Sequence, residues 1–488
     1  MPSDSQPTAK LPALEIAELR VRLAEVEGKL DELLTMNLAL VAENERLRAR
    51  AGMNSKNSSK PPSSDGYAKP PPKTRRVRSG KKPGKQPGSE GNHLAQVAEA
   101  DELVIHRPDS CDSCGSDLVN APVTGTVTRQ VFDLPPRSVV VTEHRSQRRR
   151  CACGTTTTAG FPAEAIGPAC YGPVLRAHVC YLVVRQHIPI KRVAELLCDA
   201  YGIPVSTGAI VAMVQEGSNR LGSFLDSLAD RLRDTEIVHA DETGLRVGGD
   251  LHWVHATSSR AHSLYHLDTH RGRKAMDAMD VLAHLRGVLV HDGWQPYRDY
   301  TEVDHALCNA HHLRELDGIS GNHQDQGWAH HMAALLSATW TEVLAAKDHG
   351  VTSLDPAALD RIRTDYDTII EAGRLVNPPA VRTGKRGRPR NTLSANLLRR
   401  LDIYRDDILR FADDFRVPFD NNEAERSVRM VRVQQKISGG FRSVEGARSW
   451  LRVRSYVATA IKQGMNPLDA LVRLTADDPW MPDSPHWI

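Results

Sequence analysis

Two short apolar segments that each end in an aspartate constrain the fold of this chain more than any other feature. They are residues 235–241 and 287–292, and they end in Asp241 and Asp292. Apolar runs of this length that are bounded by turn residues predict buried β-strands. The segments between them predict two further strands, 252–258 and 263–268, and one helix, 271–285. The expected order is therefore three strands, a helix and a fourth strand.

This order is the opening of an RNase H-like α/β sheet, in which the first and fourth strands are neighbours. Asp241 and Asp292 would then converge at one place on the sheet. Carboxylates that converge repel each other unless they hold a cation, and oxygen ligands favour Mg²⁺ or Mn²⁺. The sequence therefore predicts a divalent-metal site at this place.

A predicted helix that begins near Asp420, a suitable N-cap, offers a third carboxylate. Its apolar face would hold Ala424, Val428 and Val431. Its polar stripe would hold Asn421, Glu425, Arg429 and Arg432. Glu423 is offset from Glu425 by about 200° around the helix, so only one of the two can face the metals. We expect Glu425 to do so, although any single acidic residue is more often a surface carboxylate.

Four cysteines form two close pairs, each followed by a glycine. They are Cys111, Cys114, Cys151 and Cys153. Two thiolate pairs suit tetrahedral zinc, and the glycine permits the tight turn that aims sulfur at the metal. Such a site would be structural, because four protein sulfurs leave no coordination position open. The alternative is four unrelated buried thiols.

The stretch between the two cysteine pairs predicts a strand, with Val139 and Val141 in alternation before a run of arginines.

The chain has only eight cysteines in 488 residues, which is too few for a disulfide scaffold and favours a reducing cytoplasm. A hydrophobic content of 40% allows a sizeable core, so global disorder is excluded.

The N-terminal segment has apolar residues at heptad spacing. The a and d positions are Ile16, Leu19, Leu23, Val26, Leu30, Leu33, Asn37, Leu40, Asn44 and Leu47. Both polar exceptions are asparagines at a, which favours a two-stranded coiled coil with a fixed register. The alternative is a single amphipathic helix that lies on a globular domain.

Residues 51–93 are rich in Pro, Gly and Ser and carry a strong excess of Lys and Arg. This composition cannot repay the entropy of ordering, so it predicts a disordered tether. The basic residues that would contact a phosphate backbone are Arg75, Arg76, Arg78, Lys81 and Lys82. A solvated linker without DNA contacts is the alternative.

The residues after the cysteine module predict three helices. Pro173 opens the first, 191–200 forms the second, and the turn 201–204 leads to a third helix capped by Ser206. A short helix, a glycine turn and a capped helix form a helix-turn-helix pattern, which suits DNA binding. Any small helical bundle gives the same pattern, and the basic linker nearby is what favours DNA.

The order and spacing of these motifs resemble the insertion-sequence 66 family of bacterial transposases, in the DDE superfamily. Besides the cysteine module, the matching stretches are NSKNSSKPPSSD, PIKRVAELL, ADETGLRV, HDGW, CNAHHLREL, PFDNNEAERSVR, KISGGFRS and SYVATAIKQGMNPLDAL. The resemblance covers nearly the whole chain. Departures from the family pattern are His291 before the second aspartate and the loop THRGRKAMD.

The resemblance implies a triad of Asp241, Asp292 and Glu425 that holds Mg²⁺ or Mn²⁺, and a structural Zn²⁺ on the four cysteines. It implies metal-dependent cleavage at the terminal repeats of the element, followed by strand transfer into target DNA. Further DNA contacts would come from Arg426, Arg429, Arg432 and Lys436. A metal-dependent nuclease without strand transfer and a catalytically silent DNA-binding protein are the alternative classes.

The implied partners are double-stranded DNA, a second copy of the chain through the coiled coil in a homodimer or higher oligomer, and accessory proteins of the same element. The chain start lacks the pattern of a secretory signal, and no run approaches the ~20 apolar residues that span a bilayer. We therefore expect a bacterial cytoplasmic protein at the nucleoid, with no membrane contact.

The predicted organisation has six segments. They are a coiled coil over 1–52, a basic linker over 53–97, a zinc module over 98–160, a helix-turn-helix-like domain over 161–228, an RNase H-like catalytic domain over 229–462 with a helical insertion at about 313–417, and a C-terminal segment over 463–488.

Two smaller motifs have open interpretations. Cys308 and His311, three residues apart, offer metal-ligating atoms, but core packing is the favoured interpretation. Arg314 would steady the triad or a phosphate. The basic segment 385–390 would either reach a narrow minor groove or form a solvated loop.

Overall fold

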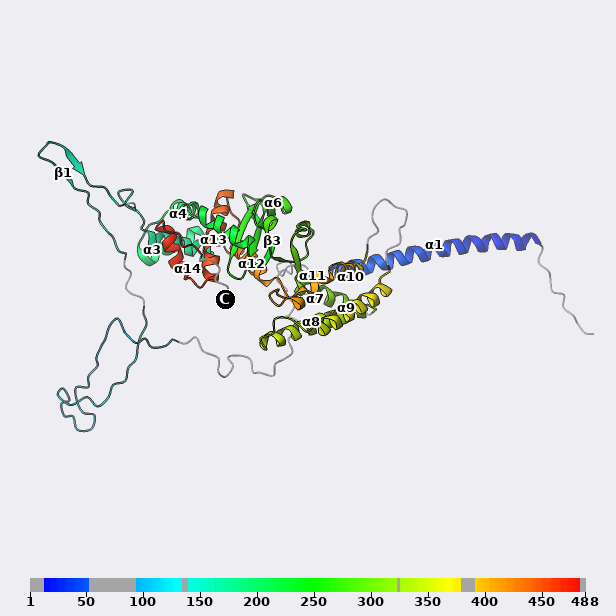
Figure 1. Ribbon diagram of the computed structural model, residues 1–488, viewed down its shortest axis with the longest axis horizontal. Coiled ribbons are helices and arrows are strands. Elements are labelled where there is room, and N and C mark those ends of the chain that lie inside the picture. The colour runs from blue at the N-terminus through cyan, green and yellow to red at the C-terminus, as the bar shows by residue number, and fades with distance from the viewer. Residues whose placement is uncertain are drawn as a thin grey trace, which may run out of the picture. The chain divides into compact units, whose positions relative to one another are not determined.

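The computed structural model describes six stretches of the chain (Figure 1), namely 13–51, 94–133, 139–162, 164–322, 325–378 and 391–482. The chain divides into two compact units. The first contains Met1–Pro72, Pro162–Ala194 and Val205–Ile488, and the second contains Lys73–Phe161 and Glu195–Pro204. The five candidate DNA-contacting residues of the basic linker lie outside the described residues, as does the basic segment 385–390.

A five-stranded mixed sheet organises the first unit. Its strand order is β5 (Ser263–Asp268), β4 (Asp250–Ser258), β3 (Ile237–Val247), β6 (Val288–His291) and β7 (Asp304–Leu307). The strands β3, β4 and β5 are antiparallel neighbours, whereas β3, β6 and β7 run parallel. The prediction that the first and fourth strands are neighbours is confirmed.

A glycine allows β6 to begin beside β3. A Cβ at Gly287 would lie 2.3 Å from the carbonyl oxygens of Thr235 and Glu236, so a larger residue would displace the backbone. The next residue, Val288, donates its N–H to the carbonyl of Glu236 at 2.7 Å. This glycine therefore helps to set the register between the two strands that carry the aspartates.

In the first unit, helices that precede the sheet along the chain pack against helices that follow it. The helix α12 (Asn422–Ser438) packs on β3 and β4, and α13 (Val444–Lys462) packs on β5. The α13 helix also contacts α4 (Thr207–Asn219), and α14 (Pro467–Thr475) contacts α2 (Pro173–Cys180). The helix α5 (Gly222–Arg233) completes this group and contacts α13 and β5.

This packing corrects the predicted boundaries around the sheet. Residues 161–228 and 463–488 do not form segments of their own, because Thr475 Oγ1 donates to the carbonyl of Pro173 at 2.8 Å. Arg220 Nη1 donates to the carbonyls of Leu474 and Thr475 at 3.2 and 2.7 Å. Apolar faces that are far apart in sequence complete one core, which local sequence patterns do not reveal.

The helices predicted over 173–219 are present. The structure has α2, a π-helical turn (Tyr181–Arg185), α3 (Ile190–Tyr201) and α4. Gly202 ends α3 at φ +69°, and Ser206 caps α4 by accepting from Ala209 N–H at 3.1 Å. DNA binding by these helices remains a prediction.

The insertion between β7 and α12 is helical, as the resemblance implies. Its helices are α7 (Asn309–Asn322), α8 (Gly327–Asp348), α9 (Pro356–Val376), α10 (Leu393–Ile403) and α11 (Arg405–Asp413). Their apolar core, with Leu336, Tyr366 and Leu401, is continuous with Val290 and Leu307 of the sheet. The insertion therefore extends the core of the sheet on the β7 side.

The helix predicted over 271–285 is wrong in its length. The structure has a short α6 (Arg273–Asp277) and 3₁₀ turns over Leu282–His284 and, after β6, over Gln295–Asp299. After α6 ends at Asp277, Asp280 adopts φ +55°, a left-handed conformation that prevents the helix from continuing to residue 285. Arg233 Nε holds this conformation by donating to the Asp280 carbonyl at 2.6 Å.

The described part of the second unit contains a small hairpin. Its strands β1 (Arg148–Arg150) and β2 (Thr156–Thr158) are antiparallel. The strand expected around Val139 and Val141 is not formed, and both side chains are exposed. Alternation alone therefore overstated the extent of the strand, because no partner strand pairs with it among the described residues.

The N-terminal helix α1 (Ala13–Ala51) spans the predicted heptads. The apolar a and d residues whose side chains are described are all at least half exposed within the single chain, namely Leu19, Leu23, Val26, Leu30, Leu33, Leu40 and Leu47. The side chains of Ile16 and Asn44 lie outside the described ones. Among the described helices, none has the length and apolarity needed to cross a membrane.

Candidate active site

The register of β3 and β6 brings two aspartates side by side. The paired residues are Ile237 with Val288 and His239 with Val290, so continuing the register by two residues aligns Asp241 with Asp292. Adjacent strands lie about 4.8 Å apart. The expectation that Asp241 ends its strand is wrong, because β3 continues to Val247, but Asp292 does directly follow β6.

Both aspartates lie in a site that disfavours negative charge. Burial raises the pKa of Asp241 well above its usual value, and the charges of Glu242, Asp292 and Glu425 add to this. Burial also raises the pKa of Asp292, again with a contribution from Glu242. Since a cation would relieve this repulsion, the electrostatics fit a metal-binding role.

The start of α12 is fastened to β3 by Asn421. Its Oδ1 lies 2.9 Å from His239 Nδ1, and its Nδ2 donates to the Ala240 carbonyl at 2.8 Å. Asn421 is therefore a buried residue that anchors α12 to β3, and it does not lie on an exposed polar stripe as predicted. The N-cap residue of α12 is Asn421 and not Asp420, so the predicted cap is wrong by one residue. Asp420 accepts from Asn422 N–H at 3.1 Å just before the helix.

The anchored helix carries Glu425 toward the aspartates. Burial raises the pKa of Glu425, the charges of Asp420 and Asp292 also raise it, and those of Arg314 and Arg429 lower it. The charge of Asp292 therefore raises the pKa of Glu425, and the charge of Glu425 raises that of Asp241. Among the described residues, however, the oxygens of Asp241, Asp292 and Glu425 do not all lie within 4.8 Å of one another.

The neighbouring acid Glu423 is held elsewhere. Its Oε1 lies 2.7 Å from the Nζ of Lys462 on α13. The same ammonium donates to the carbonyls of Ser259 and His262 at 2.7 and 2.8 Å. Glu423 thus joins α12 to the β4–β5 turn, which agrees with the prediction that only one of the two glutamates faces the aspartates.

A fourth carboxylate beside the predicted triad, Glu242, is held by a local network of hydrogen bonds. Arg271 donates to its Oε1 from Nε at 3.0 Å and from Nη2 at 2.6 Å, and Tyr297 OH donates to its Oε2 at 2.6 Å. The guanidinium of Arg271 lies 4.8 and 4.3 Å from the ring centres of Trp253 and Trp294. We name these five residues the Arg271 bracket.

The Arg271 bracket ties β3 to the turn that carries Asp292. Glu242 is next to Asp241 in sequence, and Trp294 N–H donates to Asp292 Oδ1 at 2.9 Å. This network was not predicted from the sequence. Its only sequence signals are a second acid after Asp241 and a basic loop before 271–285, which do not predict a contact across the sheet.

Two hydrogen-bonded neutral histidines, His291 and His305, also hold the turn after β6 that carries Asp292. Gly293 N–H donates to His291 Nδ1 at 3.0 Å, so the His291 proton is on Nε2, which lies 3.0 Å from His305 Nδ1. The His305 Nε2 in turn donates to the Tyr300 carbonyl at 3.1 Å. Burial lowers the pKa of both rings. His291, a departure from the family pattern, therefore has a structural contact of its own.

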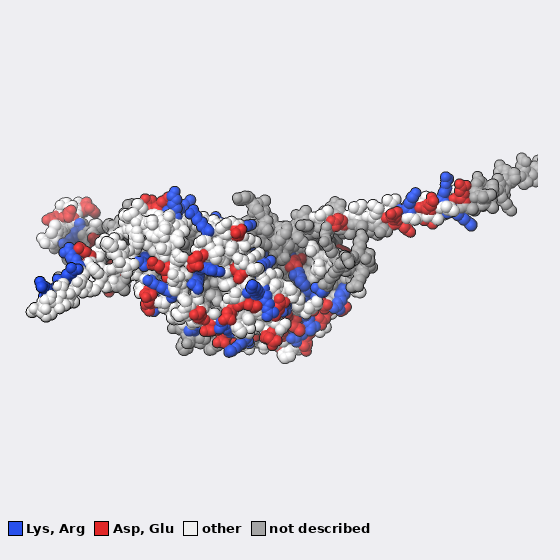
Figure 2. Space-filling view, turned by 90° about the horizontal axis from the view of Figure 1, so that it is seen from above, with Lys and Arg blue, Asp and Glu red and all other residues white. Residues whose placement is uncertain are grey.

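The predicted DNA contacts on α12 lie on its outer side. Arg426, Arg429 and Lys436 are exposed, and Arg432 is half-buried. Basic and acidic side chains are interspersed over the face of the molecule that Figure 2 shows.

The cysteine pairs of the second unit each form a tight turn. Gly115 (φ +72°) donates to the Cys111 carbonyl at 2.8 Å, and Gly154 (φ +90°) donates to the Cys151 carbonyl at 2.9 Å. A hydrogen bond from Ser116 lowers the pKa of Cys114, and one from Thr155 lowers the pKa of Cys153 to about 7. Both turns favour thiolates, which are the metal-binding form.

The structure does not gather the four sulfurs into one cluster. Among the described residues, the only group of three or more candidate ligands is Cys308, His311 and Glu425. All four cysteines of the two turns are free thiols, and three of them are exposed. The two turns are thus formed separately, and binding of one zinc ion by all four cysteines would require the turns to come together.

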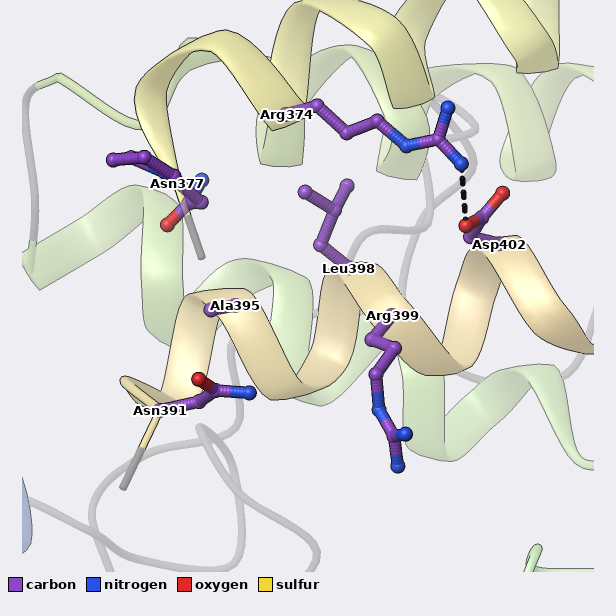
Figure 3. A pocket seen from close by; sticks show the side chains of 8 residues that line it. Arg374, Asn377, Asn391, Ala395, Leu398, Arg399 and Asp402 are labelled. Atoms are coloured by element: carbon purple, nitrogen blue, oxygen red, sulfur yellow. Dashed lines mark hydrogen bonds and ion pairs between the residues drawn. The ribbon is translucent and has the colours of Figure 1, made fainter. Parts of the chain in front are cut away.

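One cavity of about 190 Å³ lies in the helical insertion, away from the predicted site residues. Figure 3 shows Arg374 and Asp402 on facing helices, with Arg374 Nη2 2.6 Å from Asp402 Oδ2. The lining residues are Arg374, Asn377, Pro378, Asn391, Ala395, Leu398, Arg399 and Asp402. None belongs to the triad, so this cavity is not the candidate active site.

Comparison with known proteins assigns most of the chain. Residues 168–449 match the family described as Transposase IS66 family, and residues 108–154 match the zinc-finger binding domain of transposase IS66. Residues 4–95 match a family of unknown function. An uncharacterized protein, y4qI of Sinorhizobium fredii (strain NBRC 101917 / NGR234), is 22% identical over 414 residues, which cover 80% of this chain and 75% of that protein.

The first match alone covers more than half of the chain, including β3, β6 and α12. The second covers both cysteine turns. The chain belongs to the IS66 family of transposases and carries its zinc-finger domain ahead of a mixed sheet-and-helix transposase domain.

Proposed function

We propose that this chain is a DDE transposase that cuts the ends of its insertion sequence and joins them to target DNA. The observation that carries the proposal is the parallel register, which, continued by two residues, pairs Asp241 with Asp292. The contribution of the Glu425 charge to the raised pKa of Asp241 supports Glu425 as the third carboxylate. The strand order, with the first and fourth strands adjacent, supports an RNase H-like core. Family membership supports DNA as the substrate.

The donor set at this site fits hard divalent cations. Three carboxylates whose pKa values are all raised would gain free energy from a nearby positive charge. Carboxylate oxygens are the ligands that Mg²⁺ and Mn²⁺ prefer. We assign Asp241, Asp292 and Glu425 as these ligands. Bound divalent ions would polarise a scissile phosphate and acidify a water.

The remaining residues of the site hold the ligands and the substrate. The Arg271 bracket and the His291–His305 pair fix the turn after β6, and Asn421 fixes the start of α12. Arg429, with Arg426, Arg432 and Lys436 on the same helix, would bind the DNA backbone beside Glu425. Arg314, whose charge lowers the pKa of Glu425, would hold that carboxylate ionised.

The reaction would proceed as two phosphoryl transfers. Water would attack a phosphodiester at the end of the element, and the bond from phosphorus to the 3′-oxygen would break, which releases a 3′-hydroxyl. That hydroxyl would attack a target phosphodiester, and a target 3′-hydroxyl would leave. Each step forms one P–O bond and breaks one, so no further reactant is needed.

The other parts of the chain would assemble this reaction on DNA. We assign Cys111, Cys114, Cys151 and Cys153 to a structural zinc, which family membership supports. Arg75, Arg76, Arg78, Lys81 and Lys82 would add phosphate contacts, and the helices over 173–219 would bind the terminal repeat. A coiled coil would pair two chains and two ends. Such a protein acts where the chromosome lies, in the bacterial cytoplasm at the nucleoid.

A strand-transfer assay tests the proposal. The purified chain is incubated in Mg²⁺ with a labelled duplex that carries an end of the element and with a plasmid target. We expect both nicked and joined products, which Asp292→Asn abolishes. Nicked product without joined product would favour a nuclease, and specific binding without cleavage would favour a silent DNA-binding protein. Either result would overturn the proposal.

A further inference from the structure

Three candidate metal ligands meet at the junction of β7, α7 and α12. Cys308 directly follows β7, His311 lies in the first turn of α7, and Glu425 comes from α12. Their sulfur, ring-nitrogen and carboxylate-oxygen atoms all lie within 4.8 Å of one another. His311 Nε2 and Glu425 Oε1 lie 4.0 Å apart.

The donor set differs in kind from the triad. A cysteine sulfur, an imidazole and a carboxylate form a zinc-type set, whereas Mg²⁺ takes oxygen ligands. Burial raises the pKa of the Cys308 thiol to about 12, so zinc binding would release its proton. Three protein ligands leave a fourth tetrahedral position for water. Core packing, the interpretation favoured from sequence, explains the burial of Cys308 but does not explain why a half-buried imidazole faces a carboxylate.

The backbone already holds these ligands close together. Asn421 N–H donates to Cys308 Sγ at 3.2 Å, and Asn309 N–H donates to the Phe419 carbonyl at 3.0 Å. His311 N–H donates to the Cys308 carbonyl at 3.1 Å, which places both side chains at one end of α7. The Nδ1 of His311 is buried without a hydrogen-bond partner among the described residues.

Zinc would require only a small closure. Zn–S and Zn–N bonds of about 2.3 and 2.0 Å put tetrahedral ligands roughly 3.5 Å apart. The side chains would therefore move together by about 1 Å, and Glu425, which is still partly exposed, has room to do so.

We propose that Cys308, His311 and Glu425 form a second Zn²⁺ site, distinct from the four-cysteine zinc finger, and that zinc bound there withdraws Glu425 from the Mg²⁺ site. The binding part stands on the geometry of the three ligands alone. The inhibitory part rests on the proposed function, because it assigns Glu425 to the triad.

Zinc stoichiometry tests the binding part independently of any reaction. The full chain is equilibrated with excess Zn²⁺, desalted and analysed for metal. We expect two zinc ions per wild-type chain, and one for Cys308→Ser and for His311→Gln. Cys180→Ser is the matched control, because Cys180 is also a buried thiol but has no such neighbours, and it should keep two.

A complementary variant separates the two zinc sites. Cys111→Ser should lose the finger ion and keep one that Cys308→Ser then removes. One ion in the wild type, or two in both Cys308→Ser and His311→Gln, would overturn the proposal. Thermal unfolding of each variant shows whether it is folded, and His311→Gln serves if Cys308→Ser is not.

The inhibitory part is tested as a ratio of cleavage rates with and without zinc. In Mg²⁺, saturating Zn²⁺ should slow cleavage by the wild type at least tenfold and should slow His311→Gln less than twofold. Equal inhibition of both proteins would overturn this part. A chain that binds two zinc ions but cuts no DNA would contradict the proposed function and leave the second zinc site standing.

Discussion

Among single residues, Glu425 and Glu423 have the same chemistry but different surroundings. Glu425→Gln should abolish cleavage in Mg²⁺ and in Mn²⁺ while binding to element ends stays near normal, because it removes a ligand charge and no DNA contact. Glu423→Gln should reduce cleavage less than tenfold. It should instead lower the free energy of unfolding by roughly 1–2 kcal/mol, since it weakens the contact with Lys462.

The comparison is informative only if both variants are folded, which circular dichroism can establish. An inactive Glu423→Gln together with an active Glu425→Gln would contradict the assignment. In that event, α12 would have to be rotated relative to the arrangement described here.

The raised pKa of Asp241 makes a stability prediction with a definite sign. The pKa of Asp241 is higher in the folded than in the unfolded state, so its ionisation opposes folding. The resulting loss of stability grows as the pH rises above the pKa that Asp241 has in the unfolded chain. At pH 8 without metal, Asp241→Asn should therefore raise the free energy of unfolding by about 1 kcal/mol or more.

The same substitution should remove most of the stabilisation that Mg²⁺ confers on the wild type. Thermal unfolding with and without Mg²⁺, at pH 5 and pH 8, measures both effects, and the metal effect should be larger at pH 8. If Asp241→Asn were less stable than the wild type without metal, and equally stabilised by Mg²⁺, the three-carboxylate site would be refuted.

At the scale of elements, the Arg271 bracket couples β3 to the turn after β6. Arg271→Lys keeps the positive charge but loses the paired hydrogen bonds to Glu242. It also loses the planar guanidinium that contacts the rings of Trp253 and Trp294. We expect the Mg²⁺ concentration for half-maximal thermal stabilisation to rise about three- to tenfold. Arg273→Lys is the control, because Arg273 contacts Asp277 and Tyr300 and not Glu242. Unchanged Mg²⁺ dependence in Arg271→Lys would exclude a positioning role.

The two cysteine turns form a second element whose integrity should depend on zinc. Chelation or Cys111→Ser should increase hydrogen exchange over residues 98–160 and weaken binding to element ends, because structural zinc contributes folding free energy directly. The sheet of the first unit should keep its protection. The control is Cys170→Ser, since Cys170 is exposed and lies outside both turns. Unaltered exchange in Cys111→Ser would rule out the zinc assignment.

For the whole molecule, the exposed leucines of α1 predict self-association. Replacing Leu23 and Leu30 by Lys should convert a dimer to a monomer in sedimentation experiments on the full chain, because both are a positions. Glu25→Lys, on the outer face of the same helix, is the control. Replacing Asn37 and Asn44 by Leu should raise stability and broaden the range of oligomers. A wild-type chain that stays monomeric at high micromolar concentration would contradict the coiled coil.

The sequence by itself determined the order of elements and the identity of the candidate ligands. Strands of alternating or continuous apolar residues, glycines at Gly115 and Gly154 and the cap at Ser206 are local features, so local patterns predicted them. The same applies to Asp241, Asp292 and Glu425, because each occupies a recognisable position at a strand or a helix. The resemblance to the family then tied these separate motifs to one reaction.

Only the tertiary structure decided which distant residues meet. Nothing local indicates that Asn421 bonds to β3, that Arg271 lies between two tryptophans, or that Glu425 approaches Cys308 and His311. The tertiary structure also showed that β3 extends past Asp241 and that the helix expected over 271–285 ends at Asp277. The physical reason is that side-chain pairing across the sheet depends on register and on how α12 lies over it, which are properties of the packed core and not of any single segment.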